Sequence, residues 1–243
     1  MTPAPEALAA AVRHGFEPER NPRRAAGAQA YLKTTMPFYG LSAAVLRRVC
    51  RQAFADHPLS TAADWRTAIA VLWDRAEHRE DWYAAIELAR HKPYQRFLSL
   101  ALLPLCRRMI REGAWWDTVD AWSVCVGALL ERYPDQMNRT LRAWARQDDR
   151  WLRRTAIIAQ TRRRDQTDLE LLAACIEPSL ESREFFLRKA IGWALRELAK
   201  GNPALVRKLL ATYGDRLSPL SRREALKGFA FVERHGLLRH HKR

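Results

Sequence analysis

The sequence Trp115-Trp116-Asp117-Thr118-Val119-Asp120-Ala121-Trp122 begins the segment that decides the fold. On a helix, apolar residues at i, i+4, i+7 and i+11 form one stripe, which predicts a core face made of Trp115, Val119, Trp122 and Val126. A second stripe, about 100° round the helix axis, carries an indole, an acid, a hydroxyl and bare backbone: Trp116, Asp120, Ser123 and Gly127. We interpret this second stripe as a surface that a ligand approaches closely.

The same pattern recurs along the chain with a period near 35 residues. A small residue inside an apolar helical segment recurs with steps of 36, 35, 34 and 35, at Ala85, Ala121, Ala156, Ala190 and Ala225. Five residues before each of these alanines stand Glu80, Trp116, Trp151, Phe185 and Leu220. A repeat of this length with two helical segments is typical of helical-hairpin solenoids of the HEAT type.

Signals for helix ends agree with this period. Asn202-Pro203 and Ser218-Pro219 place an N-cap residue before a proline at the first helical position, and Gly201 is expected to end the preceding helix. Hairpin dipeptides and sustained alternation are absent, so strands are not expected. The sequence therefore predicts an all-α protein of HEAT-like helical hairpins that form a curved superhelix with a concave basic groove. We expect one domain over residues 1–243, with loosely attached ends at 1–24 and 235–243.

Charge indicates the partner of that groove. The chain has 42 Lys+Arg against 27 Asp+Glu, a net charge of +15, and 9 Trp in 243 residues. This combination of cations and aromatic rings favours nucleic acid. An apolar run long enough to cross a membrane and a signal peptide are both absent, which predicts a cytoplasmic, nucleoid-associated protein of bacterial type. The four cysteines are scattered without metal-ligand spacing, and we expect buried thiols, with no metal and no cofactor.

The segment from 183 to 200 has one apolar and one cationic face. Leu187, Ile191, Ala194 and Leu198 form the predicted core stripe, and about 200° away stand Lys189, Trp193, Arg196 and Lys200. Trp193 could instead be a packed repeat residue. Arginines that stand two residues before the alanines could pair with acids of a neighbouring repeat or bind phosphate, and both alternatives stay open for Arg154, Arg188 and Arg223.

Several longer motifs resemble the AlkD family of DNA alkylation-repair glycosylases. They are the segments 31–33 (Tyr-Leu-Lys), 38–41 (Phe-Tyr-Gly-Leu), 115–120, 151–157, 184–197 and 219–225, so the resemblance covers about residues 25–230. It implies removal of cationic alkylpurines, such as 3-methyladenine and 7-methylguanine, from duplex DNA without rotating the base into a pocket. Residue by residue, it implies a catalytic carboxylate at Asp120 and two indoles beside the sugar at Trp116 and Trp193. It also implies DNA contacts at Arg154, Arg196 and Tyr31, to which the charge pattern adds Lys189, Lys200 and Arg188.

The residue types suit that chemistry without the resemblance. An alkylated purine already carries positive charge, so it leaves readily and needs no general acid. The difficulty lies in the oxocarbenium-like sugar, whose positive charge the carboxylate of Asp120 can oppose while the faces of Trp116 and Trp193 contact the sugar. One acid therefore suffices, unlike in the two-carboxylate sugar hydrolases.

Two other functions remain open at this stage. One is a catalytically silent HEAT module that binds damaged or branched DNA, for which Asp120 would be dispensable. The other is a scaffold for an acidic protein partner, which the indoles inside the cationic stripe disfavour. For the enzyme, we expect a monomer acting on double-stranded DNA. The preferred lesion and the role of the basic tail do not follow from the sequence.

Overall fold

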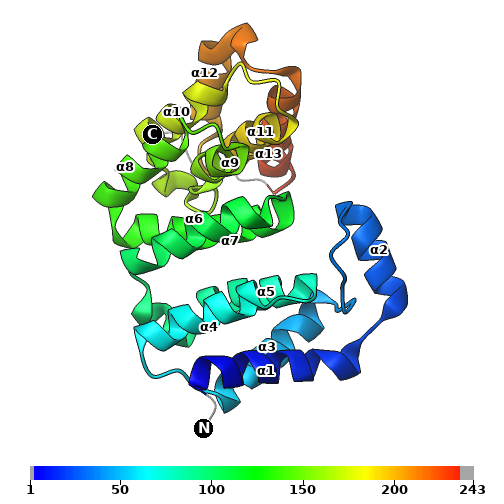
Figure 1. Ribbon diagram of the computed structural model, residues 1–243. Coiled ribbons are helices and arrows are strands. Elements are labelled where there is room, and N and C mark those ends of the chain that lie inside the picture. Colours follow the sequence, from blue (N-terminus) through cyan, green and yellow to red (C-terminus); the bar gives the residue numbers. More distant parts are fainter. Residues whose placement is uncertain (1–2, 236–243) are drawn as a thin grey trace. The chain divides into compact units, whose positions relative to one another are not determined.

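The computed structural model of the protein describes residues 3–235, and this part of the chain is helical with no β-strand (Figure 1). The chain divides into two compact units, Met1–Leu105 and Cys106–Arg243. The predicted all-α class is thus confirmed. Whether the chain forms one domain with a continuous superhelix stays a prediction, and the units are described one at a time. Of the predicted basic tail, only His235 lies inside the described residues.

Unit 1 contains five α-helices before the boundary helix α6 (Leu103–Gly113). They are α1 (Ala4–Phe16), α2 (Pro22–Leu32), α3 (Ala43–Asp56), α4 (Ala62–Asp74) and α5 (Arg79–Arg90). Helix α1 packs against α3 and α4, and its Leu8, Val12 and Phe16 are fully buried. The expectation of a loosely attached end at 1–24 is therefore wrong for α1, whose apolar side chains form part of the core. Only short 3-10 helices, η1 (Glu17–Glu19), η2 (Lys92–Phe97) and η3 (Leu100–Leu102), complete the unit.

The motif at 38–41 is held by a buried carboxylate. Glu80, at the start of α5, accepts hydrogen bonds from the backbone N–H groups of Tyr39 (3.0 Å), Gly40 (2.8 Å) and Leu41 (3.1 Å). Gly40 has φ of +83°, and an added Cβ would lie 2.2 Å from the backbone oxygen of Asn21, so only glycine fits there. This motif therefore has a structural role in connecting α2, α3 and α5.

Unit 2 is built from two layers of helices. One layer contains α7 (Trp116–Arg132), α9 (Arg150–Ile158), α11 (Phe185–Gly201) and α13 (Pro219–Arg234), each packed against the next. The other contains α8 (Pro134–Trp144), α10 (Leu169–Ile176) and α12 (Pro203–Tyr213), which pack on the first layer. Short 3-10 helices, η4 (Arg164–Gln166), η5 (Glu177–Ser179) and η6 (Gly214–Arg216), lie in the connections.

The five repeat alanines lie on five successive odd-numbered helices, α5 to α13. Four are buried, with exposed fractions from 0% to 3%, and Ala121 is half-buried. The residues five positions earlier all lie in the first turn of their helices, so the sequence period correctly predicts the helical register. The repeat is thus a real unit of packing within unit 2.

The predicted helix ends and thiols are also confirmed. The Asn202 side chain accepts a hydrogen bond from the Leu205 N–H, the Ser218 hydroxyl accepts one from the Ser221 N–H, and α11 ends at Gly201. The cysteines Cys50, Cys106, Cys125 and Cys175 are free and buried. Among residues 3–235, no helix combines the length and the apolar character needed to cross a membrane.

Candidate active site

Helix α7 presents Asp120 from its first two turns. Trp115 precedes the helix as its N-cap residue, and Asp117 lies in the first turn, where a negative charge complements the helix dipole. Val119 and Trp122 are fully buried and fix which face of α7 points into the core. As a result, Asp120 lies at the edge of the core, with 19% of its side chain exposed.

Arg154 on α9 holds the Asp120 carboxylate in a bidentate ion pair. Its Nε donates to Oδ1 and its Nη2 donates to Oδ2, both at 2.7 Å. Its remaining nitrogen, Nη1, donates to the backbone carbonyl of Phe186 on α11 at 2.8 Å. A planar guanidinium with two parallel bonds fixes both the position and the plane of the carboxylate. Three helices, α7, α9 and α11, thus determine where the carboxylate lies.

The same contacts bear on the predicted role of Arg154. Only 6% of its side chain is exposed, and each guanidinium nitrogen donates a hydrogen bond within the protein. Of the two alternatives left open by the sequence, the geometry favours pairing with an acid of the neighbouring repeat over direct phosphate contact. Arg154 is therefore best described as a positioning residue for Asp120.

Burial and ion pairing act in opposite directions on Asp120. Burial raises its pKa, the hydrogen bonds and charge of Arg154 lower it, and the charge of Asp117 raises it again; the pKa lies above the ordinary value of 3.8. A carboxylate that is costly to bury interacts strongly with any positive charge that develops beside it. This environment is suited to opposing a transient cation.

The two predicted indoles lie in the same unit as Asp120. Trp193 on α11 is half-buried, and the Arg154 guanidinium carbon lies 6.0 Å from its ring centroid, so Arg154 connects the acid with this indole. Trp116 is the first residue of α7, half-buried, and one turn before Asp120 on the same helical face. The structure thus places all three predicted catalytic residues on α7 and α11 of unit 2.

An aromatic cluster supports the site through Phe186. The ring centroids of Trp115 and Phe186 are 5.3 Å apart, those of Trp151 and Phe186 4.9 Å, and those of Trp115 and Trp151 6.1 Å. These rings fix Phe186, whose carbonyl accepts the third hydrogen bond from Arg154. The role of Phe186 has no signature in the sequence, because a backbone carbonyl leaves no mark on the residue type.

The interpretation of Ser123 and Gly127 as an open, ligand-facing surface is wrong. Ser123 is 2% exposed, and its hydroxyl donates to the backbone carbonyl of Asp120 at 2.7 Å. An added Cβ on Gly127 would lie 2.6 Å from the carbonyl oxygen of Ala159. The close approach that requires glycine is that of the end of helix α9 in the same protein. Of this stripe, only Trp116 and Asp120 are therefore partly exposed.

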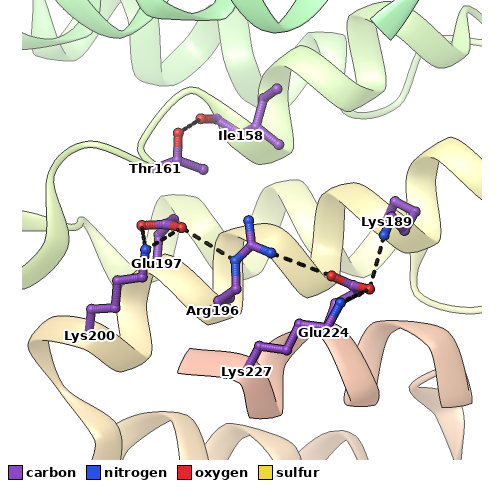
Figure 2. A network of polar contacts seen from close by, with 8 residues as sticks. All are labelled: Ile158, Thr161, Lys189, Arg196, Glu197, Lys200, Glu224 and Lys227. Carbon is purple, nitrogen blue, oxygen red and sulfur yellow. Dashed lines mark hydrogen bonds and ion pairs between the residues drawn. The ribbon is translucent and has the colours of Figure 1, made fainter. Parts of the chain in front are cut away.

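The predicted cations of α11 belong to a network with two carboxylates (Figure 2). Lys200 Nζ lies 2.7 Å from Glu197 Oε2, and Arg196 Nε donates to Glu197 Oε1 at 3.4 Å. Lys189 Nζ lies 2.9 Å from Glu224 Oε1 on α13. With Lys227, the network has four cations and two carboxylates, a net charge of +2. The stripe is therefore cationic, although less so than its lysines and arginines alone suggest.

The other two predicted DNA-binding residues are Arg188 and Tyr31. Arg188 on α11 is half-buried, and its Nε donates to the backbone carbonyl of Ser182 at 2.7 Å. Tyr31 lies on α2 in unit 1 with 73% of its surface exposed. Within residues 3–235, no group of three or more His, Cys, Asp and Glu side chains gathers in a way that could hold a metal ion.

Comparison with known proteins identifies the family of this chain. The family model described as "DNA alkylation repair enzyme" matches residues 12–229. The chain belongs to the DNA alkylation repair enzyme family. The resemblance inferred from the motifs is thereby confirmed, and the match begins earlier, inside α1. No curated protein matches the chain.

A solved structure of the family agrees with this assignment. The chain is similar to a "Predicted DNA alkylation repair enzyme from Enterococcus faecalis", with 32% sequence identity and a TM-score of 0.77. The match covers 86% of this chain and 95% of the other. The family thus accounts for nearly the whole chain, including every predicted site residue.

Proposed function

We propose that the protein is a monofunctional DNA glycosylase that hydrolyses the N-glycosidic bond of cationic alkylated purines in duplex DNA. Its substrates would be 3-methyladenine, 7-methylguanine and bulky cationic adducts, and it would act as a monomer in base excision repair. Family membership makes DNA the substrate class. The observation that carries the proposal further is the Asp120 carboxylate, which Arg154 holds at 2.7 Å on both oxygens while its guanidinium carbon lies 6.0 Å from the Trp193 ring centroid.

In this proposal Asp120 stabilises the sugar as the bond to the base breaks. The base leaves as a neutral purine because it starts with a positive charge, so no proton donor is required. The deoxyribose becomes oxocarbenium-like, and the ionised carboxylate opposes that charge and orients the attacking water. Each carboxylate oxygen keeps lone pairs outside the Arg154 bonds, since a carboxylate can accept about four hydrogen bonds.

Trp116 and Trp193 would contact the sugar with the faces of their rings. Such a contact with a developing cation contributes about 0.5–2 kcal/mol where water is excluded. Contact with the sugar and backbone would let the lesion stay stacked in the duplex, without a base pocket. The helical hairpins would form the predicted curved superhelix, with its basic groove along the DNA.

The second candidate is a catalytically silent DNA-binding module. One observation favours it: the Asp120–Arg154 pair joins neighbouring repeats, as a purely structural ion pair would. On this account the carboxylate would contribute to folding and not to chemistry. The two candidates differ in whether any base is released.

The test is base release from duplexes of defined lesion. Purified protein is incubated with duplexes that contain 7-methylguanine, 3-methyladenine or a bulky cationic purine adduct, and abasic sites are then cleaved with alkali. We expect cleavage of all three and none of duplexes that contain uracil or hypoxanthine, whose neutral bases need a general acid. Binding without release of any cationic base would support the silent module. Efficient release of uracil would show a general acid or a base pocket that this mechanism lacks.

A further inference from the structure

Glu224 is a buried carboxylate that the proposed chemistry does not use. Its side chain on α13 is 6% exposed, and three cations contact it (Figure 2). Its Oε1 lies 2.7 Å from Lys227 Nζ and 2.9 Å from Lys189 Nζ, and its Oε2 lies 3.5 Å from Arg196 Nη1. Two of these cations, Lys189 and Arg196, come from α11, the helix that carries Trp193.

A glycine on α11 creates the place for this carboxylate. An added Cβ on Gly192 would lie 2.5 Å from the Cβ of Glu224 and 2.8 Å from the backbone oxygen of Ser221. Gly192 lies between Lys189 and Arg196 in the sequence, so the bare backbone there admits Glu224 between the two cations. Gly228 allows a matching approach of α13, since its added Cβ would lie 2.5 Å from the Arg196 carbonyl oxygen. Close helix packing therefore determines the position of the carboxylate.

Glu224 is ionised near neutral pH. Burial would raise its pKa, but the hydrogen bonds and charges of Lys227 and Lys189 outweigh this, and the pKa lies below its usual value. An ionised, fixed acid restricts the rotamers of the cations around it. Free Lys and Arg side chains have many rotamers, so they lose conformational entropy when a ligand fixes them. Cations that are already ordered lose less on binding, which is preorganisation.

The ordered cations flank the predicted catalytic indole. Lys189 is one turn before Trp193 on α11 and Arg196 is almost one turn after it, on the same face. Their side chains remain 37% and 29% exposed, so both can reach a ligand. We propose that Glu224 is a positioning residue, which holds Lys189 and Arg196 on either side of Trp193 to bind the DNA phosphates that flank the damaged nucleotide.

This inference rests on the proposed function for the location of the DNA, but its test does not depend on catalysis. A simple electrostatic effect predicts the opposite sign, since removing a negative charge from the cluster would strengthen attraction to phosphate. The direction of the change therefore separates ordering from neutralisation.

The experiment compares Glu224→Gln with wild type for binding to an undamaged duplex, measured by fluorescence anisotropy at fixed salt. We expect Kd to rise about tenfold, because two side chains that were ordered in the free protein must then be ordered on binding. The matched control is Glu170→Gln, which makes the same charge change at a carboxylate that is 88% exposed on α10 and should leave Kd within about twofold. Equal or tighter binding by Glu224→Gln, with an unchanged melting temperature, would overturn the proposal.

Two further variants keep the test decisive if Glu224→Gln folds poorly. Glu224→Asp keeps the charge but shortens the side chain, and it should weaken binding by about threefold; wild-type affinity would contradict the positioning role. In a Lys189→Gln background, adding Glu224→Gln should cost less than it does alone, because the two residues act together. Equal costs would show that Glu224 does not act through Lys189. Release of 7-methylguanine by wild type is measured separately. A protein that binds DNA but releases no base would overturn the proposed function, and the effect of Glu224→Gln on Kd could still be interpreted.

Discussion

Asp120 and Glu224 occupy the same position in the repeat but lie in opposite electrostatic environments. Each stands one residue before a repeat alanine, on α7 and α13 respectively. Asp120 has one cationic partner, Arg154, and its pKa is raised; Glu224 has three, and its pKa is lowered. One repeat register can therefore hold a carboxylate of raised or of lowered pKa, depending on its burial and on how many cations the neighbouring helices supply.

The neighbours of each acid explain its assigned task. Asp120 has one cationic partner, whose guanidinium carbon lies 6.0 Å from the Trp193 ring centroid, so fewer cations surround its carboxylate than surround that of Glu224. Glu224 is surrounded by cations whose side chains remain partly exposed. We assign its negative charge the task of ordering these side chains. We therefore assign the chemical step to Asp120, which has one cationic partner, and DNA binding to Glu224, which has three.

The largest expected difference concerns removal of a cation from each acid. Arg154→Ala leaves Asp120 without its partner, which should cost about 3 kcal/mol of unfolding free energy, as is typical of a broken buried pair. It should also slow excision by about 10–100-fold, because misplacement of a catalytic group by about 1 Å costs this much. Lys227→Ala removes one of three cations, 54% exposed, and should cost less than about 1 kcal/mol. Urea unfolding and single-turnover excision measure both; similar costs at the two sites would contradict the distinction.

Trp193→Ala should have the next largest effect. Loss of one ring face beside the sugar removes about 0.5–2 kcal/mol, which corresponds to a decrease of about 2–30-fold in the single-turnover rate. Trp193→Phe retains an aromatic face and should fall between wild type and Trp193→Ala. If Trp193→Ala changed only the affinity for DNA, Trp193 would belong with its neighbours Lys189 and Arg196 as a binding residue.

The two acids also predict the pH dependence of excision. The proposed mechanism requires ionised Asp120. Since burial raises its pKa, the rate should begin to fall at a pH above the usual range of an aspartate as the solution is acidified. Arg154 lowers this pKa, so Arg154→Gln should move the acid limb to still higher pH. Glu224, whose pKa is lowered, stays ionised across this window. A pH–rate profile for 7-methylguanine, which stays cationic on the acidic side of neutrality, tests this; an acid limb unmoved by Arg154→Gln would contradict the assignment.

The smallest predicted effect is on the salt dependence of binding. If about 5–8 phosphates are neutralised, log K should fall with log salt at a slope of roughly −4 to −7. Arg196→Ala should reduce the slope by about 1, whereas the buried Arg154 should contribute none. Arg139→Ala, an exposed cation on α8 in the other helical layer, is the matched control and should leave the slope unchanged. A reduced slope for Arg154→Ala would restore its predicted phosphate contact.

The sequence predicted the helices well because their signals are local. Apolar residues at helical spacing, N-cap residues and prolines predicted the register of α7, α11 and α13, and the motif resemblance located Asp120 and Trp193. Contacts between helices were not predictable in the same way. Gly127 and Gly192 admit neighbouring helices at distances that no single-helix pattern reveals, and the backbone carbonyl of Phe186 has no sequence signature. Glu224 could have been found, since it shares the register of Asp120, but its adjacent basic residues hid it within a cationic pattern.

The central claim is that the charge of Asp120 drives the chemical step. The most direct measurement is the single-turnover release of 7-methylguanine by Asp120→Asn at saturating protein, compared with wild type and with Glu170→Gln as the control for loss of one negative charge. We expect Asp120→Asn to lower the rate by about 10²-fold or more, as is typical for loss of one well-placed electrostatic group, with Kd for DNA little changed or lower. Glu170→Gln should match wild type. A wild-type rate for Asp120→Asn would show that the carboxylate is structural and would contradict the account.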